Sequence, residues 1–355
     1  MAVALRVRFG PAGLPDEENF KLSVETLLRR AYDACQVDFS NGITFEVARA
    51  QEMPPLTEGK DIVFSFHAPY YIQLSKEQGA VRHLAMVEHV AHIAYVFGSR
   101  LVVVHPGFLQ GRTREDVTRV VVRNLQAAVE RLRTRGYGEV ALGVENMGNK
   151  ANFGVLEEVL DIVRRTEGTV PVVDFAHVHA VSDGGLKTRE DFAALLDHIR
   201  ERLGLRRLGV LNGHFSDVRY RRSREVKHLK YGEGDLRVAP LILAACDQRT
   251  DLTLISESHE EESNQRILQE IRQALSSYRE GPEIGPLPAG NRERRVALYT
   301  HLKHSHRLGN RSRCYRSHRV VTGLGDDWRS RDAAFGEDTG PPSAALRPSI
   351  AYGCS

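Results

Sequence analysis

The stretch LVVVHPGFLQGRTREDVTRVVVRNLQAAVERLRTRGYGEVALGVE, residues 101–145, contains the pattern that identifies the fold. It begins with a short β-branched run, LVVVH at 101–105, and ends with a second one, VALGVE at 140–145. Between these runs, apolar residues recur over 113–135 at the spacing of three and four that is typical of an amphipathic helix. The order strand, helix, strand predicts a β-α-β unit with parallel strands.

The same alternation continues through residue 280. The other strand candidates are ALRVRF (4–9), ITFEVA (43–48), IVFSF (62–66), TVPVVD (169–174), LGVLNGH (208–214) and LTLISE (252–257), and the other helical patterns cover 22–36, 76–97, 153–166, 187–202 and 259–278. Eight strands with intervening helices predict an α/β fold, a (β/α)₈ TIM barrel, which usually spans about 250 residues. An open doubly wound sheet is the alternative, and it is disfavoured because no GxGxxG motif follows the first strand.

Residues 281–355 have a different composition. They begin with the Pro/Gly-rich segment GPEIGPLPAG and continue with basic segments that lack apolar periodicity. They contain 12 Lys and Arg against 7 Asp and Glu, which leaves 37 basic and 39 acidic residues in 1–280. We therefore expect a barrel domain over 1–280 that is not a generally basic nucleic-acid binder, followed by a mostly disordered basic tail over 281–355. A shifted reading frame near the end of the gene is an alternative origin of this tail.

Cysteines and apolar runs indicate the compartment. The four cysteines form no CxxC pair, which argues against a disulfide framework and against a thiolate zinc site. The apolar run at the N-terminus contains Arg6 and Arg8, so it does not have the pattern of a signal peptide. No apolar stretch is long enough to span a membrane. We expect a cytoplasmic monomer.

Side chains that can bind metal ions follow several of the predicted strands. They are His67, His105, Glu145, Asp174 with His177, His214 and Glu257, and His228 lies in the segment after the seventh strand. The C-terminal ends of all barrel strands meet at one mouth, so these side chains are expected to converge there. A ligand set that mixes imidazoles with carboxylates suits Zn²⁺, Mn²⁺ or Fe²⁺. Ca²⁺ and Mg²⁺ instead prefer sites made of oxygen ligands alone. Glu145 could bridge two ions with its two oxygens, as phosphodiester hydrolysis by paired cations requires.

The motifs at these positions resemble those of one known family. HAPY (67–70), VVVHPG (102–107), VEN (144–146), DFAH (174–177), HFSD (214–217), HLKYGEG (228–234) and the late strand-end Glu257 are similar to motifs of the endonuclease IV family of apurinic/apyrimidinic endonucleases. Members of this family are xylose-isomerase-like TIM barrels with a trinuclear zinc site. The resemblance covers roughly residues 4–278 in consistent order. It implies a zinc-dependent DNA-repair hydrolase that cuts damaged double-stranded DNA on the 5′ side of abasic sites.

The resemblance also implies ligand sets. A first zinc ion would use His67, His105 and Glu145, a second would use Glu145, Asp174, His214 and Glu257, and a third would use His177 and His228. At the third site the sequence departs from the family, which has an Asp where this chain has Val226. On a regular strand, Val226 and His228 share a face and Glu225 points away. We therefore expect two zinc ions, with the third site absent, weak, or completed by Glu225 or Asp217.

Further residues are candidates for catalysis and for substrate binding. Glu145 and Glu257 are the catalytic candidates, Glu145 as the bridging ligand and Glu257 as a ligand that also positions water. Tyr70 matches a family tyrosine on the DNA-binding face. A basic run after His214 comprises Arg219, Arg221, Arg222, Arg224, Lys227 and Lys230, and within it Arg219 and Lys227 are candidates for phosphate contacts.

Two other functions are alternatives. Sugar isomerases and epimerases of the same barrel superfamily resemble this chain at Glu145, Asp174, His214 and Glu257, around a single divalent ion and a small sugar substrate. The pair His67 and His105 argues against this reading, because a single-ion isomerase does not need two extra imidazoles. A non-catalytic metal-binding barrel is the third alternative, and the complete ligand sets argue against it.

Overall fold

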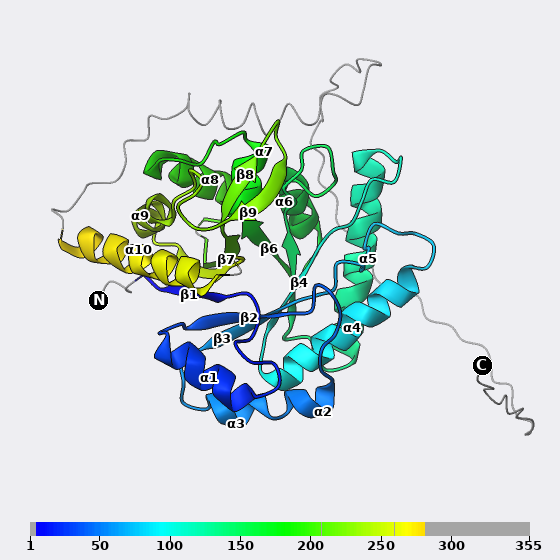
Figure 1. Cartoon of the computed structure of the whole chain (residues 1–355). Helices are drawn as coiled ribbons and strands as arrows, with labels where there is room; N and C mark the ends of the chain where they lie inside the picture. Colours follow the sequence, from blue (N-terminus) through cyan, green and yellow to red (C-terminus); the bar gives the residue numbers. More distant parts are fainter. Residues whose placement is uncertain (1–4, 207, 259, 281–355) are drawn as a thin grey trace, which may run out of the picture. The chain divides into compact units, whose positions relative to one another are not determined.

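A single sheet of parallel strands forms the centre of the computed structural model, which describes residues 5–206, 208–258 and 260–280. Its order is β1-β10-β7-β6-β5-β4-β3-β2 (Figure 1). The strands are β1 (Val7–Pro11), β2 (Ala34–Asp38), β3 (Val63–His67), β4 (Leu101–Val104), β5 (Ala141–Glu145), β6 (Thr169–Asp174), β7 (Val210–Phe215) and β10 (Asp251–Ser256). A parallel bridge between Ala12 and Gln36 joins the ends of β1 and β2. The sheet is thus a nearly closed barrel, which confirms the predicted TIM-barrel fold.

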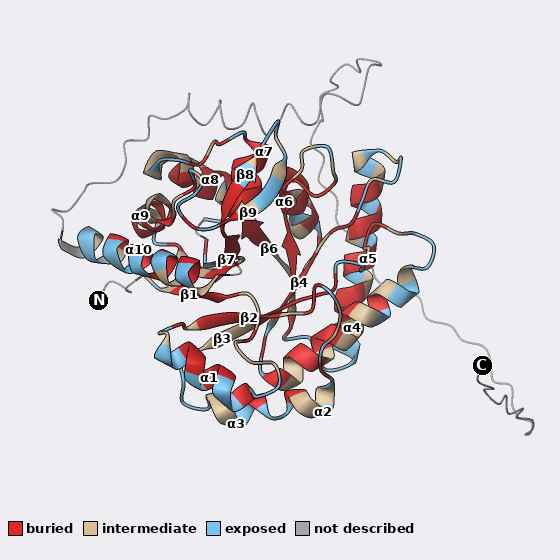
Figure 2. Cartoon of the chain, in the orientation of Figure 1, coloured by how far each residue is buried: buried red, intermediate tan, exposed pale blue. Residues whose placement is uncertain are grey.

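Helices cover the outside of the barrel. They are α1 (Phe20–Arg29), α2 (Val47–Ala50), α3 (Met53–Thr57), α4 (Ala80–Phe97), α5 (Arg114–Thr134), α6 (Leu156–Arg165), α7 (Phe175–Val181), α8 (Arg189–Arg202), α9 (Val238–Gln248) and α10 (Glu261–Glu280). In α5, the Thr113 side chain caps the first turn by accepting a hydrogen bond from the Asp116 amide, and Val117, Val121 and Leu125 are fully buried. The helices bury the side that faces the strands and expose the other (Figure 2).

The second strand lies where the sequence predicted a helix. We expected a helix over 22–36 and a strand over 43–48, but α1 ends at Arg29 and β2 follows five residues later. The helix stops because Ala31 adopts a left-handed conformation with φ of 58°. Residues 43–46 instead form a loop, and residues 47 and 48 begin α2; from the loop, the Phe45 ring packs 5.1 Å from that of Phe20.

A hairpin that the sequence did not predict follows β7. Strands β8 (Asp217–Tyr220) and β9 (Glu225–Leu229) pair in antiparallel fashion. Arg219 pairs with Lys227, whereas Tyr220 pairs with Glu225, so Val226 is an extra residue in β9. This β-bulge shifts the alternation of side chains at the end of the strand.

Other predictions concern the membrane and the tail. Within the described ranges, the helices are all too short or too polar to cross a membrane. The predicted tail over 281–355 lies outside the described residues, as do Cys314 and Cys354. The other two cysteines, Cys35 and Cys246, are buried, and Cys35 is a free thiol.

Candidate metal centre

All eight predicted ligands lie at the C-terminal ends of the barrel strands or on segments that follow them. Their ligand atoms form three groups, and within each group the atoms lie within 4.8 Å of one another. The first cluster is His67, His105 and Glu145, the second cluster is Glu145, Asp174, His214 and Glu257, and the third cluster is His177, Glu225 and His228. The structure therefore brings together every side chain that the sequence predicted to converge, together with Glu225, one of the two residues named as able to complete the third site.

Glu145 belongs to the first and the second cluster. It ends β5 and is only 1% exposed. Its Oε2 lies 3.1 Å from Nε2 of His67 and 3.1 Å from Nε2 of His105, whereas its Oε1 lies 3.0 Å from Nδ1 of His214. Burial favours the neutral acid, but the imidazoles of His214 and His105 hold the pKa of Glu145 well below its usual range. The carboxylate is therefore charged, and each of its oxygens faces a different cluster.

In the first cluster, a backbone carbonyl orients His67, and the ring of Tyr70 packs beside both histidines. Nδ1 of His67 donates to the carbonyl of Ala68 at 2.8 Å, which leaves Nε2 as the atom that faces Glu145. The ring of Tyr70 lies 5.2 Å from that of His67 and 4.9 Å from that of His105, and Tyr70 is 50% exposed. Tyr70 thus lies at the rim of the centre, where a substrate can reach it.

The second cluster contains a carboxylate oxygen, Oδ2 of Asp174, that is buried without a hydrogen-bond donor from the described residues. Asp174 caps α7, and its Oδ1 accepts a hydrogen bond of 2.7 Å from the His177 amide. Its Oδ2 is buried and, among the described residues, has no hydrogen-bond donor. Burial, only partly offset by His177, raises the pKa of Asp174 to about 7. The nearest positive group is Nδ1 of His177 at 3.4 Å, which donates to Asn146 instead. A buried carboxylate oxygen without a hydrogen-bond donor costs free energy, and a cation held in the second cluster would interact with it favourably.

Glu257 connects the second and third clusters. It follows β10, its Oε1 lies 3.0 Å from Nδ1 of His214, and its Oε2 lies 3.9 Å from Nε2 of His228. Burial would raise the pKa of Glu257, but His214 lowers it to about 2. Glu145 and Asp174 are buried and Glu257 is half-buried, so three carboxylates lie beside one another with little access to water. Such a set repels itself unless positive charge lies between its members, so the donor set fits divalent cations.

The third cluster corrects our expectation for Glu225. Its Oε2 lies 2.9 Å from Nε2 of His177 and its Oε1 lies 3.1 Å from Nε2 of His228, so the side chain does not point away. Val226 is instead 57% exposed. The reason is the bulge: with Val226 as the extra residue, Glu225 and His228 fall on the same face of β9. A carboxylate therefore stands between the two histidines without an Asp at position 226.

The other predicted residues of this region lie elsewhere. The carboxylate of Asp217 accepts hydrogen bonds from the amides of Gly232 and Gly234, at 3.0 and 2.8 Å, so it holds a turn and is not part of the third cluster. Arg219 and Lys227 pair across the hairpin and are exposed. They lie on the face opposite His228, so they do not line the clusters, and their contact with phosphate stays a prediction.

Sequence reasoning missed three residues that orient the ligands. Asn146 accepts from the Asp174 amide through Oδ1 at 2.9 Å, and its backbone carbonyl lies 2.7 Å from Nδ1 of His177. Gln36 contacts Nε2 of His214 at 3.0 Å, and Ser216 contacts Nδ1 of His228. Asn146 and Ser216 stand inside the motifs VEN and HFSD, which could have drawn attention to them. Gln36 gave no signal, because its segment was predicted to be helical.

Comparisons with known proteins agree with this architecture. A family model described as xylose isomerase-like TIM barrel matches residues 24–280. An uncharacterized protein of Methanocaldococcus jannaschii is 28% identical over 254 residues, which are 70% of this chain and 91% of that protein.

Solved structures share the fold at lower identity. Endonuclease IV from Thermus thermophilus has a TM-score of 0.59 and 22% identity, covering 76% of this chain and 99% of that one. A D-tagatose 3-epimerase-like protein has a TM-score of 0.58 and 19% identity, covering 76% and 98%. A D-psicose 3-epimerase has a TM-score of 0.52 and 14% identity, covering 77% and 98%. One fold is thus shared with proteins named for two reaction classes, so the choice between them depends on the site.

Proposed function

The chain belongs to the xylose isomerase-like TIM barrel family, and on this basis we propose that it is a divalent-metal-dependent phosphodiesterase that cleaves DNA on the 5′ side of abasic sites. The substrate in this proposal is damaged double-stranded DNA. We further propose that the enzyme is a cytoplasmic monomer. The free, buried thiol of Cys35 fits a reducing compartment.

The observation that carries the proposal is the position of Glu145 between two clusters. Its Oε2 faces His67 and His105, and its Oε1 faces His214. A carboxylate in this position can serve two neighbouring cations. Bound divalent cations would neutralise the charge of a phosphodiester and lower the pKa of a water molecule. A single-ion isomerase has no use for the first cluster.

The residues of the chain have distinct tasks in this reaction. Glu145 holds the first two clusters together, and Glu257 supplies carboxylate oxygens between the second and third clusters, where the water that attacks the phosphate has to be positioned. Tyr70 contacts the DNA at the rim. The mixture of imidazoles and carboxylates suits Zn²⁺ best and also accepts Mn²⁺.

The number of ions in the proposal follows from Glu225. The sequence predicted two ions because the third site lacked a carboxylate. With Glu225 between His177 and His228, the third cluster offers three ligand atoms within reach of one another. We therefore propose that it also binds a cation, more weakly than the other two clusters because it is less buried.

A sugar epimerase is the second candidate, and the composition of the second cluster favours it. Glu145, Asp174, His214 and Glu257 by themselves could hold one ion. Two glutamates would then stand beside a small sugar substrate, able to move protons at carbons next to a carbonyl. In this case His67 and His105 would line the substrate pocket rather than bind metal.

One experiment decides between the two candidates. Protein loaded with Zn²⁺ or Mn²⁺ is incubated with a duplex that carries a single abasic site, and in parallel with ketoses such as D-psicose and D-tagatose. We expect a nick on the 5′ side of the abasic site and no conversion of the ketose. Conversion of a ketose, with no nick in Zn²⁺, Mn²⁺ or Co²⁺, would replace the phosphodiesterase by the epimerase.

A further inference from the structure

The third cluster is divided between the β8–β9 hairpin and a helix. Glu225 and His228 stand on β9, whereas His177 stands on α7. The two strands of the hairpin form a sheet of their own, separate from the barrel sheet. Zn²⁺ binds nitrogen and oxygen ligands at about 2 Å, so one ion can reach all three side chains only if the hairpin keeps a fixed position against α7. The contacts that fix this position therefore control the site.

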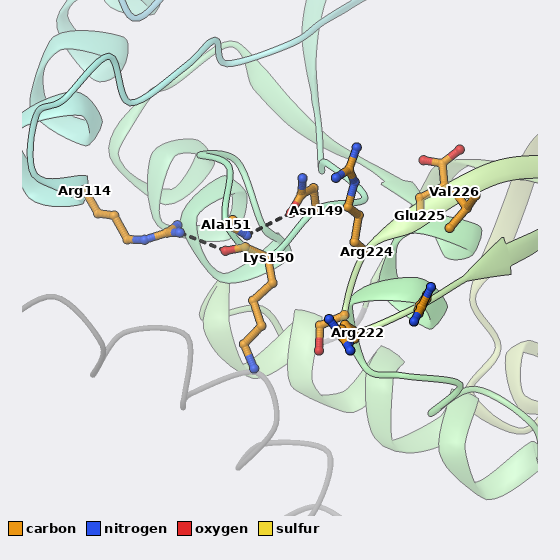
Figure 3. Close-up of a pocket in the computed structure, with 10 residues that line it drawn as sticks. Arg114, Asn149, Lys150, Ala151, Arg222, Arg224, Glu225 and Val226 are labelled. Carbon is orange, nitrogen blue, oxygen red and sulfur yellow. Dashed lines mark hydrogen bonds between the residues drawn. The ribbon is translucent and has the colours of Figure 1, made fainter.

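The turn of the hairpin is held by two neighbouring loops. In the loop after β5, the Lys150 amide donates to the Ser223 carbonyl at 3.1 Å, and the Gly148 carbonyl accepts from the Glu225 amide at 2.7 Å. Figure 3 shows this end of the hairpin, with Glu225, beside the segment that contains Lys150. Asp183, two residues after α7, accepts from the Ser223 hydroxyl at 2.6 Å. These contacts hold the turn, but none of them involves a residue of α7 itself.

Asp235 joins the hairpin to α7. This residue follows the turn at 232–234, and its carboxylate has donors from three different segments. Nε2 of His179, on α7, lies 2.9 Å from Oδ1. The hydroxyl of Tyr220, on β8, lies 3.1 Å from Oδ2, and Nζ of Lys187 lies 2.7 Å from the same oxygen. One carboxylate thus connects α7, the hairpin and the loop that follows α7.

The bond from His179 is the buried part of this network. Nδ1 of His179 accepts from the Leu186 amide at 3.1 Å, so the ring hydrogen is on Nε2 and is donated to Asp235. His179 is fully buried, and the loss of its acceptor would leave a buried N–H without a partner. The ion pair with Lys187 matters less, because the side chains of Asp235 and Lys187 are 43% and 53% exposed.

The ring of Tyr220 packs tightly on the segment around α7. It lies edge-on to His179, with ring centroids 5.0 Å apart and an interplanar angle of 84°. Its hydroxyl is so close to Gly184 that a Cβ at that position would overlap it. This close packing resists movement of the hairpin towards α7, and the bonds to Asp235 resist movement away from it. The position of the hairpin is therefore fixed in both directions.

We propose that Asp235 is a positioning residue for the third cluster. By joining the hairpin to α7, it sets the distance of Glu225 and His228 from His177. Removal of a group that orients metal ligands typically lowers metal affinity by about 10-fold to 100-fold. Asp235 acts through the hairpin and touches none of the ligands, so we expect the lower value. The inference rests on the proposed function, because it concerns the third ion of the same centre.

The test measures metal binding by the full-length chain in the absence of DNA. The protein is stripped with a chelator, and the dissociation constant of each Zn²⁺ ion is measured by competition with a zinc indicator. In Asp235→Ala, we expect the third ion to bind about 10-fold more weakly and the other two to bind as in the wild type. Asp235→Asn keeps an oxygen that can accept from His179, so it should recover most of the lost affinity.

The matched control is Glu157→Ala. Glu157 contacts the buried His198 and joins α6 to α8, so its loss removes the same kind of bond from a pair of helices outside the hairpin. We expect a lower melting temperature and no change in the affinity for the third ion. If this control weakens the third ion as much as Asp235→Ala does, the effect is general destabilisation and the inference is wrong.

Hydrogen exchange of the metal-free chain is the second measurement. The amides of β8 and β9 should exchange faster in Asp235→Ala than in the wild type, whereas those of β4 and β5 should be unchanged. Unchanged exchange of the hairpin, or wild-type affinity for the third ion in Asp235→Ala, overturns the inference. If the wild type binds only two ions, the third site of the proposed function fails, and the exchange of the hairpin alone decides the role of Asp235. Absence of nicking would refute only the proposed reaction.

Discussion

The candidate ligands at the ends of the barrel strands differ from those on the hairpin in burial and in how firmly strand pairing fixes their orientation. The first and second clusters stand mainly on β3, β5, β6 and β7, where His67, Glu145, Asp174 and His214 are at most 3% exposed. The third cluster depends on β9, where the side chains of His228 and Glu225 are 27% and 21% exposed. A buried strand end allows one residue in one orientation. The hairpin, which is paired with only one other strand, allows an extra residue and hence a change in which side chain faces inward.

This difference explains how a ligand can move along the sequence and still reach the same site. In β5 a shift by one residue would turn every side chain to the other face of the sheet and disrupt the barrel. In β9 the extra residue Val226 turns Glu225 inward and itself lies exposed. The following predictions test whether the strand-end clusters are as essential, and the hairpin cluster as adaptable, as this comparison indicates.

Glu145→Gln should have the largest effect, because it removes the charge that the first and second clusters share. We expect the nicking rate to fall by about 10³-fold or more and the metal content to fall by two ions per chain. The matched control is Glu233→Gln, an exposed glutamate after the hairpin, which should keep wild-type rates and metal content. Turnover and metal content close to wild type in Glu145→Gln would show that the two clusters do not depend on this residue.

His67→Ala should have the next largest effect, confined to the first cluster. We expect the loss of one ion per chain and a fall in nicking of about 10²-fold, since one charge-stabilising site disappears. Elemental analysis after dialysis measures the ions. Unchanged metal content would favour the epimerase, in which the second cluster holds the single ion.

Glu225→Gln should affect the third cluster alone. His177 and His228 would lose the carboxylate between them, and we expect one ion fewer and a rate lower by about 10-fold to 100-fold. The other two ions should remain after dialysis. If the ion count of the wild type is already two, and Glu225→Gln leaves it there, the third cluster does not bind metal and the expectation from the sequence was right.

Val226→Asp should have the smallest effect, although it restores the residue that the resemblance leads one to expect. Val226 is the exposed bulge residue, so the new carboxylate would point to solvent and stability should change by no more than about 0.5 kcal/mol. We expect no additional ion, and no rescue when the change is combined with Glu225→Gln. Rescue in the double variant would mean that β9 can lose its bulge and rotate.

Most of the barrel could be predicted because its strands are locally encoded. TVPVVD was predicted as a strand over 169–174 and forms β6 at Thr169–Asp174. The failure at β2 has a local cause: ACQVD follows α1 without a glycine or proline between them, and only its burial between β1 and β3 makes it a strand. Gln36, which contacts His214 from β2, was hidden by the same error.

Local sequence patterns were enough to specify the class of fold and the candidate metal-binding side chains that meet at the strand ends, because period and residue type are local properties and strand ends of a barrel must converge. The side chain that completes the third cluster depends instead on tertiary contacts. A bulge in β9 changes the alternation by one residue, and its position depends on pairing with β8 and on the hydrogen bonds that hold the hairpin turn at 221–224. Those contacts join residues far apart in the chain, such as Asp183 and Ser223, and no local pattern in either segment specifies them.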